Sequence, residues 1–372
     1  MSIETVIKAV DAMTEADWAA WSCLRDGNPA LISPYFHPDY TSTIGALRDD
    51  VRVVCRYDNG KAAAFLPIQG DRFARPVGAP MSDYHGIISA GGVTYAELLD
   101  GTSIGALHFN SAIDTEAMSA THILSELETA ALELPDTAEA WRTTRDSSYS
   151  RHMKSTRRRI RKAEEEFGPR RFVHGSRDID VFQSLIKWKV EKFVETGKYN
   201  VLSADWTMGL IRRLWERGPD APLRNDMHAL YFGDRLAAID LGLTDGNVFH
   251  SWIVAYDSEF HSFAPGIQLL EGMIDAAQGL GYSRIDLGAG TDGYKRQYAT
   301  DGQRVVSGYV PVSGPASHAS KLYAATERWG ENALADIPGK LRRRYSQIAA
   351  CEDDFSGRAR AMIDAVRTLR RA

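Results

Sequence analysis

Runs of apolar residues predict β-strands over much of residues 51–90. Two such runs in "VRVVCRYDNGKAAAFLPI" flank Asp58, Asn59 and Gly60, a sequence typical of a hairpin turn. A short helix is expected in "TYAELLDG", residues 94–101. The first half of the chain is therefore expected to be rich in strands.

The second half changes period several times. Spacings of three and four residues between apolar positions predict helices at 151–167, 180–197, 204–218 and 265–281. Alternation and turn residues predict an antiparallel three-stranded meander over 226–257, then strands at 283–288 and 304–312 around a short helix or turn at 291–299. This order predicts a mixed α/β fold, with mostly antiparallel sheets flanked by helices.

A chain of 372 residues exceeds what one hydrophobic core usually serves, so more than one domain is expected. We predict an N-terminal half at 1–149, a second domain at 150–315 and a helical basic tail at 316–372. The polar residues 135–150 are expected to connect the two halves.

Composition narrows the class of protein. Hydrophobic residues make up 44% and charged residues 25% of the chain, and the net charge of −5 is mild. Cys23, Cys55 and Cys351 lie far apart, which fits a reducing cytoplasm and disfavours a zinc site. The N-terminus lacks a signal-peptide pattern, and no stretch approaches 18 uninterrupted apolar residues. We expect a cytoplasmic protein, either free or peripheral at the inner membrane, with no DNA partner.

The segment "IDLGAGTDGYKRQYA", residues 285–299, carries Gly288, Gly290 and Gly293 in the spacing of a dinucleotide-binding loop. That loop requires a full helix after the glycines and a parallel strand ending in an acidic residue. The segment after Gly293 is short and charged, and three strands of a meander precede it. The order of elements therefore disfavours a nicotinamide or flavin site.

A second glycine offers a better phosphate site. Pro265 and Gly266 begin a predicted helix directly after a strand, and free backbone N–H groups at a helix N-terminus bind phosphates. The alternative is an ordinary strand-to-helix turn.

The predicted helix at 151–167 has seven Lys or Arg residues, followed by Glu164, Glu165 and Glu166. This order opposes the helix dipole, which favours acidic residues at the N-terminus. The helix is either a solvated charged surface or presents its basic end to an anion such as a phosphate or carboxylate.

Taken together, residues 150–168, 186–201 and 234–299 resemble the GNAT superfamily of acyltransferases. Within it they are similar to the CelD/BcsL acetyltransferase group of cellulose and exopolysaccharide biosynthesis, which is related to the FemAB peptidyltransferases. The motifs that carry the resemblance are the basic helix, Tyr256-Asp257, Pro265-Gly266, Asp286-x-Gly288-x-Gly290 and Tyr294-Lys295. One departure is Tyr298, where related motifs usually end in Phe.

The resemblance implies two GNAT-like halves in tandem and attack of an acceptor amine on the carbonyl of acetyl-CoA or another acyl-CoA, without a metal. The acceptor would be an amino sugar or another glycan-linked amine. The residues that it implies for acyl-CoA binding are Val254, Ala264, Pro265, Gly266, Ile267 and Gln268. Those that it suggests for the acceptor side are Asp83, Tyr84, His85, Arg161, Tyr256 and Tyr294.

Four catalytic candidates follow, each with a structural alternative. Lys295 would stabilise an oxyanion or a donor phosphate, or is an exposed helix lysine. Asp286 would orient the amine or Lys295, or caps the glycine loop. His250 would act as a general base, or is a hydrogen-bonded core histidine. Tyr298 or Tyr294 would protonate the departing thiolate, or the two rings serve packing.

The basic tail suggests a further partner. Residues 340–372 contain nine Lys or Arg and four Asp or Glu, a local charge of +5. It forms either a solvated helical surface or a site for an anionic membrane or for cyclic di-GMP, whose phosphates arginine binds in bidentate fashion. Two rival functions stay open: a FemAB-like transferase that uses charged tRNA, and a non-catalytic GNAT-fold sensor or scaffold.

Overall fold

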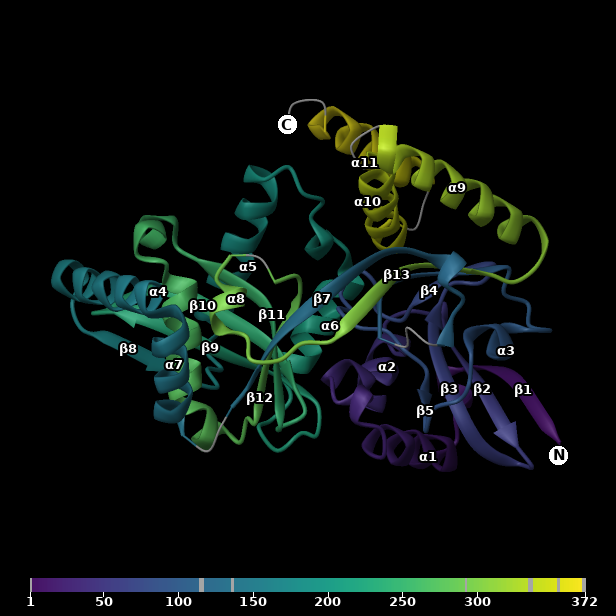
Figure 1. The fold of residues 1–372 in the computed structure, drawn as a ribbon, viewed down its shortest axis with the longest axis horizontal. Helices are drawn as coiled ribbons and strands as arrows, with labels where there is room; N and C mark the ends of the chain where they lie inside the picture. Colours follow the sequence, from purple (N-terminus) through teal and green to yellow (C-terminus); the bar gives the residue numbers. More distant parts are fainter. Residues whose placement is uncertain are drawn as a thin grey trace. The chain divides into compact units, whose positions relative to one another are not determined.

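The computed structural model describes residues 2–113, 117–134, 137–291, 293–333, 337–352 and 355–369. The chain forms two compact units (Figure 1). Unit 1 contains residues 1–127, 197–210 and 304–372, and unit 2 contains residues 128–196 and 211–303. These units combine separate stretches of sequence and so do not follow the three continuous ranges predicted above.

Unit 1 is built on a sheet with the order β1-β2-β3-β4-β6-β13-β7, in which β5 pairs with β3. Its strands are β1 (Ile3–Ala9), β2 (Val51–Asp58), β3 (Lys61–Gln69), β4 (Phe73–Pro76), β5 (Ile88–Ser89), β6 (Ala106–Ala112), the first part of β7 (Ile123–Glu133) and β13 (Arg304–Pro311). Its helices are α1 (Glu15–Asp26), α2 (Pro38–Gly45), α3 (Tyr95–Leu99), α9 (Gly314–Ala333), α10 (Ile337–Cys351) and α11 (Phe355–Leu369). The predicted hairpin at Asn59 and Gly60 joins β2 to β3, and both turn residues have positive φ.

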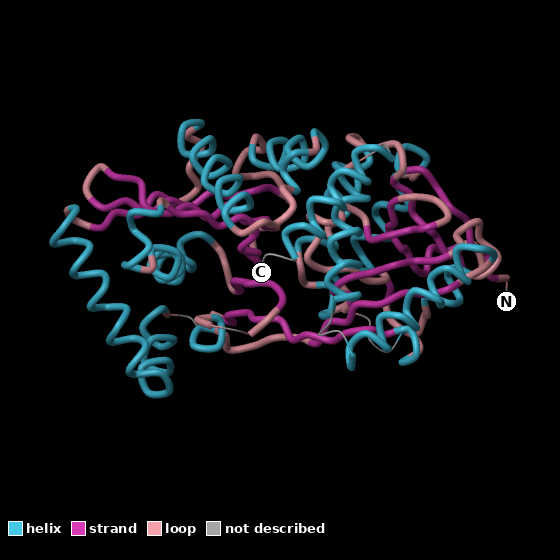
Figure 2. Tube along the Cα trace, turned by 90° about the horizontal axis from the view of Figure 1, so that it is seen from above, coloured by secondary structure: helices cyan, strands magenta, loops and turns pink. Residues whose placement is uncertain are grey.

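Unit 2 has the strand order β7-β12-β11-β10-β9-β8. Its further strands are β8 (Arg170–Val173), β9 (Arg224–Phe232), β10 (Arg235–Thr244), β11 (Val248–Tyr256) and β12 (Arg284–Ala289). Its helices are α4 (Ala138–Phe167), α5 (Ile179–Glu195), the end of α6 (Asp205–Trp215), the 3₁₀ segment η7 (Ser258–Phe263), α7 (Pro265–Leu280) and α8 (Lys295–Tyr298). Helices lie on both sides of the strands (Figure 2). The predicted mixed α/β class and the β9–β11 meander are confirmed.

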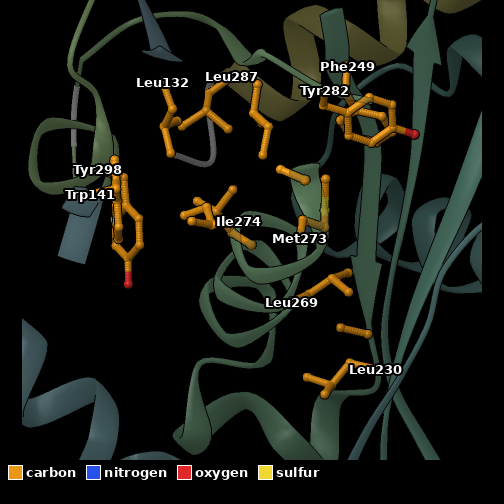
Figure 3. Close-up of a cluster of buried hydrophobic side chains, with 14 of the residues drawn as sticks. Leu132, Trp141, Leu230, Phe249, Leu269, Met273, Ile274, Tyr282, Leu287 and Tyr298 are labelled. Atoms are coloured by element: carbon orange, nitrogen blue, oxygen red, sulfur yellow. The ribbon is translucent and has the colours of Figure 1, made fainter. Parts of the chain in front are cut away.

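The core of unit 2 lies between α7, α4 and one face of the sheet (Figure 3). Leu269, Met273 and Ile274 of α7 pack against Leu230 of β9 and Phe249 of β11. Leu269 and Met273 are four residues apart and Ile274 follows Met273, so the three side chains share one face of the helix, and this apolar face is buried on the sheet.

The polar stretch 135–150 was expected to be a connector, and this expectation is wrong for most of it. Helix α4 begins at Ala138 and continues to Phe167 with a kink at Tyr149. Trp141 anchors this part, because its side chain is 2% exposed and stacks on the ring of Tyr298 at 5.4 Å. One buried aromatic residue therefore holds a helical segment whose other residues are mostly polar. Residues 135 and 136 lie outside the described part of the chain.

The predicted helical tail is confirmed in the residues that the structure describes, as α9, α10 and α11. Two of its basic residues are engaged inside unit 1. Arg342 is buried and pairs with Glu327 at 2.8 Å, and Arg344 donates to the carbonyl of Gly197 at 2.9 Å. Binding of a cyclic dinucleotide or a membrane by the tail stays a prediction, and Arg370 and Arg371 lie outside the described residues.

Candidate functional site

In unit 2, strands β11 and β12 form a short parallel ladder and then separate. They pair only at Val248–His250 with Arg284–Asp286. Beyond this point β12 shifts its register against β7, between Asp286 and Ala289. Gly288 lies in that shift with φ of +75°, a conformation that favours glycine. The outer half of β11 therefore has an open edge.

A cavity of about 540 Å³ lies at this opening. This volume is within the range of small-molecule sites. It is lined by Arg159, Asp240, Ser251, Val254, Tyr256, His261, Ser262, Ala264, Pro265, Gly266, Ile267, Leu270, Leu287 and Tyr294. Seven of the predicted site residues therefore meet here: Val254, Tyr256, Ala264, Pro265, Gly266, Ile267 and Tyr294.

The N-terminus of α7 forms one end of the cavity. Its N-cap residue, Ala264, has left-handed backbone angles (φ 55°, ψ 56°) and makes no side-chain capping bond. Within the described part of the chain, no group accepts a hydrogen bond from the N–H of Gly266. A Cβ at Gly266 would meet only Cγ1 of Val254, at 3.9 Å. An uncapped helix N-terminus facing a cavity is suited to an anionic group.

Asp240 of β10 supplies a buried carboxyl group to the same cavity. Its Oδ2 accepts a hydrogen bond from Ser251 Oγ at 2.6 Å, and its Oδ1 has no partner among the described residues. Burial raises the pKa of Asp240 to about 7, against the opposing effects of Ser251, His250 and Lys189. A carboxyl group that titrates near neutral pH can accept and return a proton.

Two further groups act at the edge of β11. Lys189 of α5 donates from Nζ to the carbonyl of Val254 at 3.3 Å, which brings a cation to the open strand. Tyr294 is 36% exposed, and its pKa is raised by desolvation and by the carboxylate of Asp240. The Tyr294 hydroxyl therefore stays protonated at neutral pH and is a potential proton donor.

His250 and Asp286 lie below this opening, in the paired part of the strands. Nδ1 of His250 is 3.5 Å from Oδ1 of Asp286, and both side chains are buried. The same Oδ1 accepts a hydrogen bond from the N–H of Gly288 at 2.7 Å. Asp286 therefore caps the glycine turn, the structural alternative considered for it, and neither residue lines the cavity.

Lys295 holds the end of β12. Its Nζ donates to the carbonyls of Leu287 at 2.7 Å and Ala289 at 3.0 Å. These two bonds direct the ammonium group into the turn rather than into the cavity that Leu287 lines. We assign Lys295 to positioning of this loop.

Three other candidates lie away from the cavity. Tyr298 is fully buried beside Trp141, and its hydroxyl donates to Oε1 of Glu271 at 2.6 Å, so the ring serves packing. Gln268 is buried and donates to the carbonyl of Phe263 at 2.9 Å. Arg161 is exposed on α4 and is not among the residues that line the cavity.

The N-terminal trio belongs to unit 1. Tyr84 and His85 are buried, and the ring of His85 lies 5.8 Å from that of Tyr95 and 6.4 Å from that of Phe109. Burial lowers the pKa of His85 to about 3, so the imidazole is neutral. A role of Asp83, Tyr84 and His85 toward an acceptor stays a prediction.

The residues that sequence reasoning missed are Asp240, Ser251, Lys189 and His261. A signal for Asp240 exists, since it is the only charged residue within the apolar run "LAAIDLGL". The place of Asp240 in the cavity depends on the strand pairing, which sets Asp240 opposite Val254 and brings Ser251 within hydrogen-bond distance. His261 accepts from or donates to the Tyr256 hydroxyl at 3.1 Å.

The described residues contain no group of three or more His, Cys, Asp or Glu side chains placed to hold a metal ion. They also contain no helix long and apolar enough to cross a membrane.

Comparison with known structures gives distant matches. The C-terminal DUF2156 domain of a protein assigned as a lysylphosphatidylglycerol synthetase from Agrobacterium fabrum has 10% identity and a TM-score of 0.49, covering 83% of this chain and 95% of that one. FemX has 9% identity and a TM-score of 0.42, covering 70% and 87%. A tandem GNAT protein from the clavulanic acid pathway has 10% identity and a TM-score of 0.45, covering 84% and 99%.

Comparison of the sequence with curated proteins gave no significant match. A family model does match: residues 150–296 correspond to the acetyltransferase (GNAT) domain. This range includes the parting strands β11 and β12, the start of α7 and every residue that lines the cavity. Residues 150–296 of the chain are therefore similar to a domain of the GNAT acetyltransferase type.

Proposed function

We propose that this domain transfers an acyl group from an acyl-CoA to an amine. The observation that carries the proposal is the cavity between β11 and β12, which joins an uncapped helix N-terminus to a buried carboxyl group. The Gly266 N–H and the α7 dipole would bind the pyrophosphate of the donor. The pantetheine arm of the acyl-CoA would lie along the open edge of β11 at Val254.

Asp240 is the proposed proton acceptor. The amine nitrogen attacks the thioester carbonyl carbon, a C–N bond forms, and the C–S bond breaks as the tetrahedral intermediate collapses. The proton lost by the amine passes to Asp240, directly or through Ser251 Oγ, which is 2.6 Å from Oδ2. The departing thiolate takes a proton from the Tyr294 hydroxyl, which Asp240 can then reprotonate through the cavity.

The acceptor that we propose is the amine of an amino sugar or of another envelope glycan, and support for it comes from the sequence resemblance alone. The rival is an aminoacyl group carried on tRNA. The two differ in the donor, so donor binding separates them before any acceptor is known.

Titration calorimetry with acetyl-CoA, longer acyl-CoAs and charged tRNA tests the proposal. We expect acyl-CoA to bind the wild type. It should not bind the Gly266→Trp variant, because the indole would fill the open space beside Val254. Gly279→Trp is the matched control, since it lies on exposed space at the other end of α7. Turnover is followed as free thiol released in the presence of glucosamine or chitosan oligomers. Binding of charged tRNA without acyl-CoA binding would overturn the proposal.

A further inference from the structure

A second cavity of about 490 Å³ adjoins the first in unit 2. Its walls come from the C-terminal third of α4 and the end of η7: Arg158, Arg159, Lys162, Glu165, Glu166, Ser262 and Phe263. Arg158 and Arg159 precede Lys162 by four and three residues, which places each of them beside Lys162 on the helix surface.

The charged ends of these side chains have no recorded partner. Among the residues that the structure describes, the side chains of Arg158, Arg159 and Lys162 form no ion pair or hydrogen bond. In contrast, Arg157 on the same helix pairs with Asp146. Three side-chain cations without an ion-pair partner line one cavity, and their positive charge favours the binding of an anion.

The two cavities share Arg159 and Ser262. Ser262 stands directly before Phe263 and Ala264, the N-cap of α7. A ligand whose pyrophosphate lies at the start of α7 can therefore extend past Ser262 into the basic cavity.

We infer that the basic cavity binds the 3′-phosphoadenosine end of coenzyme A, with Arg158, Arg159 and Lys162 on the 3′-phosphate. This inference rests on the proposed function and adds a donor preference to it. A phosphomonoester carries about −1.5 to −2 charges at neutral pH, and guanidinium groups bind its oxygens in bidentate fashion. The ring of Phe263 offers an apolar wall to the adenine.

The acidic residues argue for one phosphate rather than a nucleic acid. Glu165 and Glu166 line the same cavity, about one helical turn beyond Lys162. An extended polyanion would meet these carboxylates and be repelled, whereas a single phosphomonoester can lie beside the cations alone. A phosphopantetheine arm on a carrier protein lacks the nucleotide and would leave the cavity empty.

Calorimetric titrations of the full chain with CoA and dephospho-CoA test the inference. For the wild type we expect CoA to bind at least about 10-fold more tightly than dephospho-CoA. The Arg158→Ala/Lys162→Ala variant should bring the two dissociation constants within about twofold, with dephospho-CoA affinity unchanged. The control Arg151→Ala/Lys154→Ala removes the same charge from exposed positions of α4 that line neither cavity and should keep the preference.

The outcomes separate the two proposals. Equal affinity of the wild type for both ligands, with both lost in Gly266→Trp, would overturn the phosphate site and leave acyl-CoA binding intact. Equal weakening of both ligands by Arg158→Ala/Lys162→Ala would also overturn it, because the cations would then act on the pyrophosphate. Absence of binding of either ligand would overturn both proposals.

Discussion

His250 and Asp286 face each other, 3.5 Å apart, across the last paired position of β11 and β12. The strands separate directly beyond this pair, and Asp286 also accepts the N–H of the Gly288 turn. The pair therefore fixes the place where the cavity begins, although it does not line it.

Replacement of Asp286 tests this structural role. We expect Asp286→Ala to lower the free energy of unfolding by about 1–3 kcal/mol, because the buried N–H of Gly288 loses its acceptor and the buried imidazole of His250 loses its neighbouring carboxylate. Asp286→Asn retains an oxygen for Gly288 and should lose less. Chemical denaturation measures both, and an unchanged stability of Asp286→Ala would contradict the assignment.

Asp240 is expected to control the pH dependence of acyl transfer. Because the wild-type pKa is about 7, kcat/KM should rise with pH through neutrality as the carboxylate forms. Asp240→Asn should lower kcat by about 10²–10⁴-fold and remove that rise. Initial rates of thiol release between pH 5.5 and 9 measure both effects. Persistence of the same pH profile in the variant would assign the proton acceptor elsewhere.

The same carboxyl group should affect stability in a defined direction. Its folded-state pKa of about 7 lies above the ordinary 3.8, so the folded state binds the proton more tightly and stability falls as pH rises between these values. At pH 8 the full shift corresponds to about 4 kcal/mol. Asp240→Asn should therefore gain stability relative to wild type between pH 4 and pH 8, as measured by denaturation at both values. An equal difference at the two pH values would contradict the raised pKa.

Two tyrosines four residues apart should behave differently. Tyr294→Phe removes a hydroxyl from the cavity and should lower kcat without a large loss of stability. Tyr298→Phe removes the bond to Glu271 and should cost about 1 kcal/mol of stability while kcat is kept. Thermal unfolding and thiol-release rates, measured on both variants, separate the roles. A loss of kcat in Tyr298→Phe, with kcat kept in Tyr294→Phe, would assign the proton donor to Tyr298.

Local sequence signals predicted much of unit 2. The β9–β11 meander follows from turn residues at Gly233 and Gly246, and the start of α7 follows from Pro265 and Gly266. Each of these signals depends on a few neighbouring residues. Most of the predicted donor-binding positions therefore fall in the cavity.

The remaining features depend on contacts between distant residues. Asp240 acquires its raised pKa only from burial in the folded sheet, where the ladder sets it opposite Val254. Lys295 looked catalytic because it follows a glycine loop, but the fold directs its ammonium group to two carbonyls. The helix at 138–148 depends on Trp141 reaching the core. Periodicity along the chain cannot show such pairings.

The discontinuity of unit 1 has a consequence for the order of folding. In its sheet, β6 pairs with β13, and Phe109 lies opposite Gly308 in this ladder. Arg48 donates a hydrogen bond to the carbonyl of Ala350. These partners are separated by about 200 and 300 residues, and contacts so distant in sequence form slowly. During synthesis the strands β1–β6 emerge long before their neighbour, whereas β8–β12 follow one another closely. We expect residues 211–303 to acquire protection from hydrogen exchange before residues 51–112 do, and chains shortened before residue 304 to leave the first sheet with an uncovered edge.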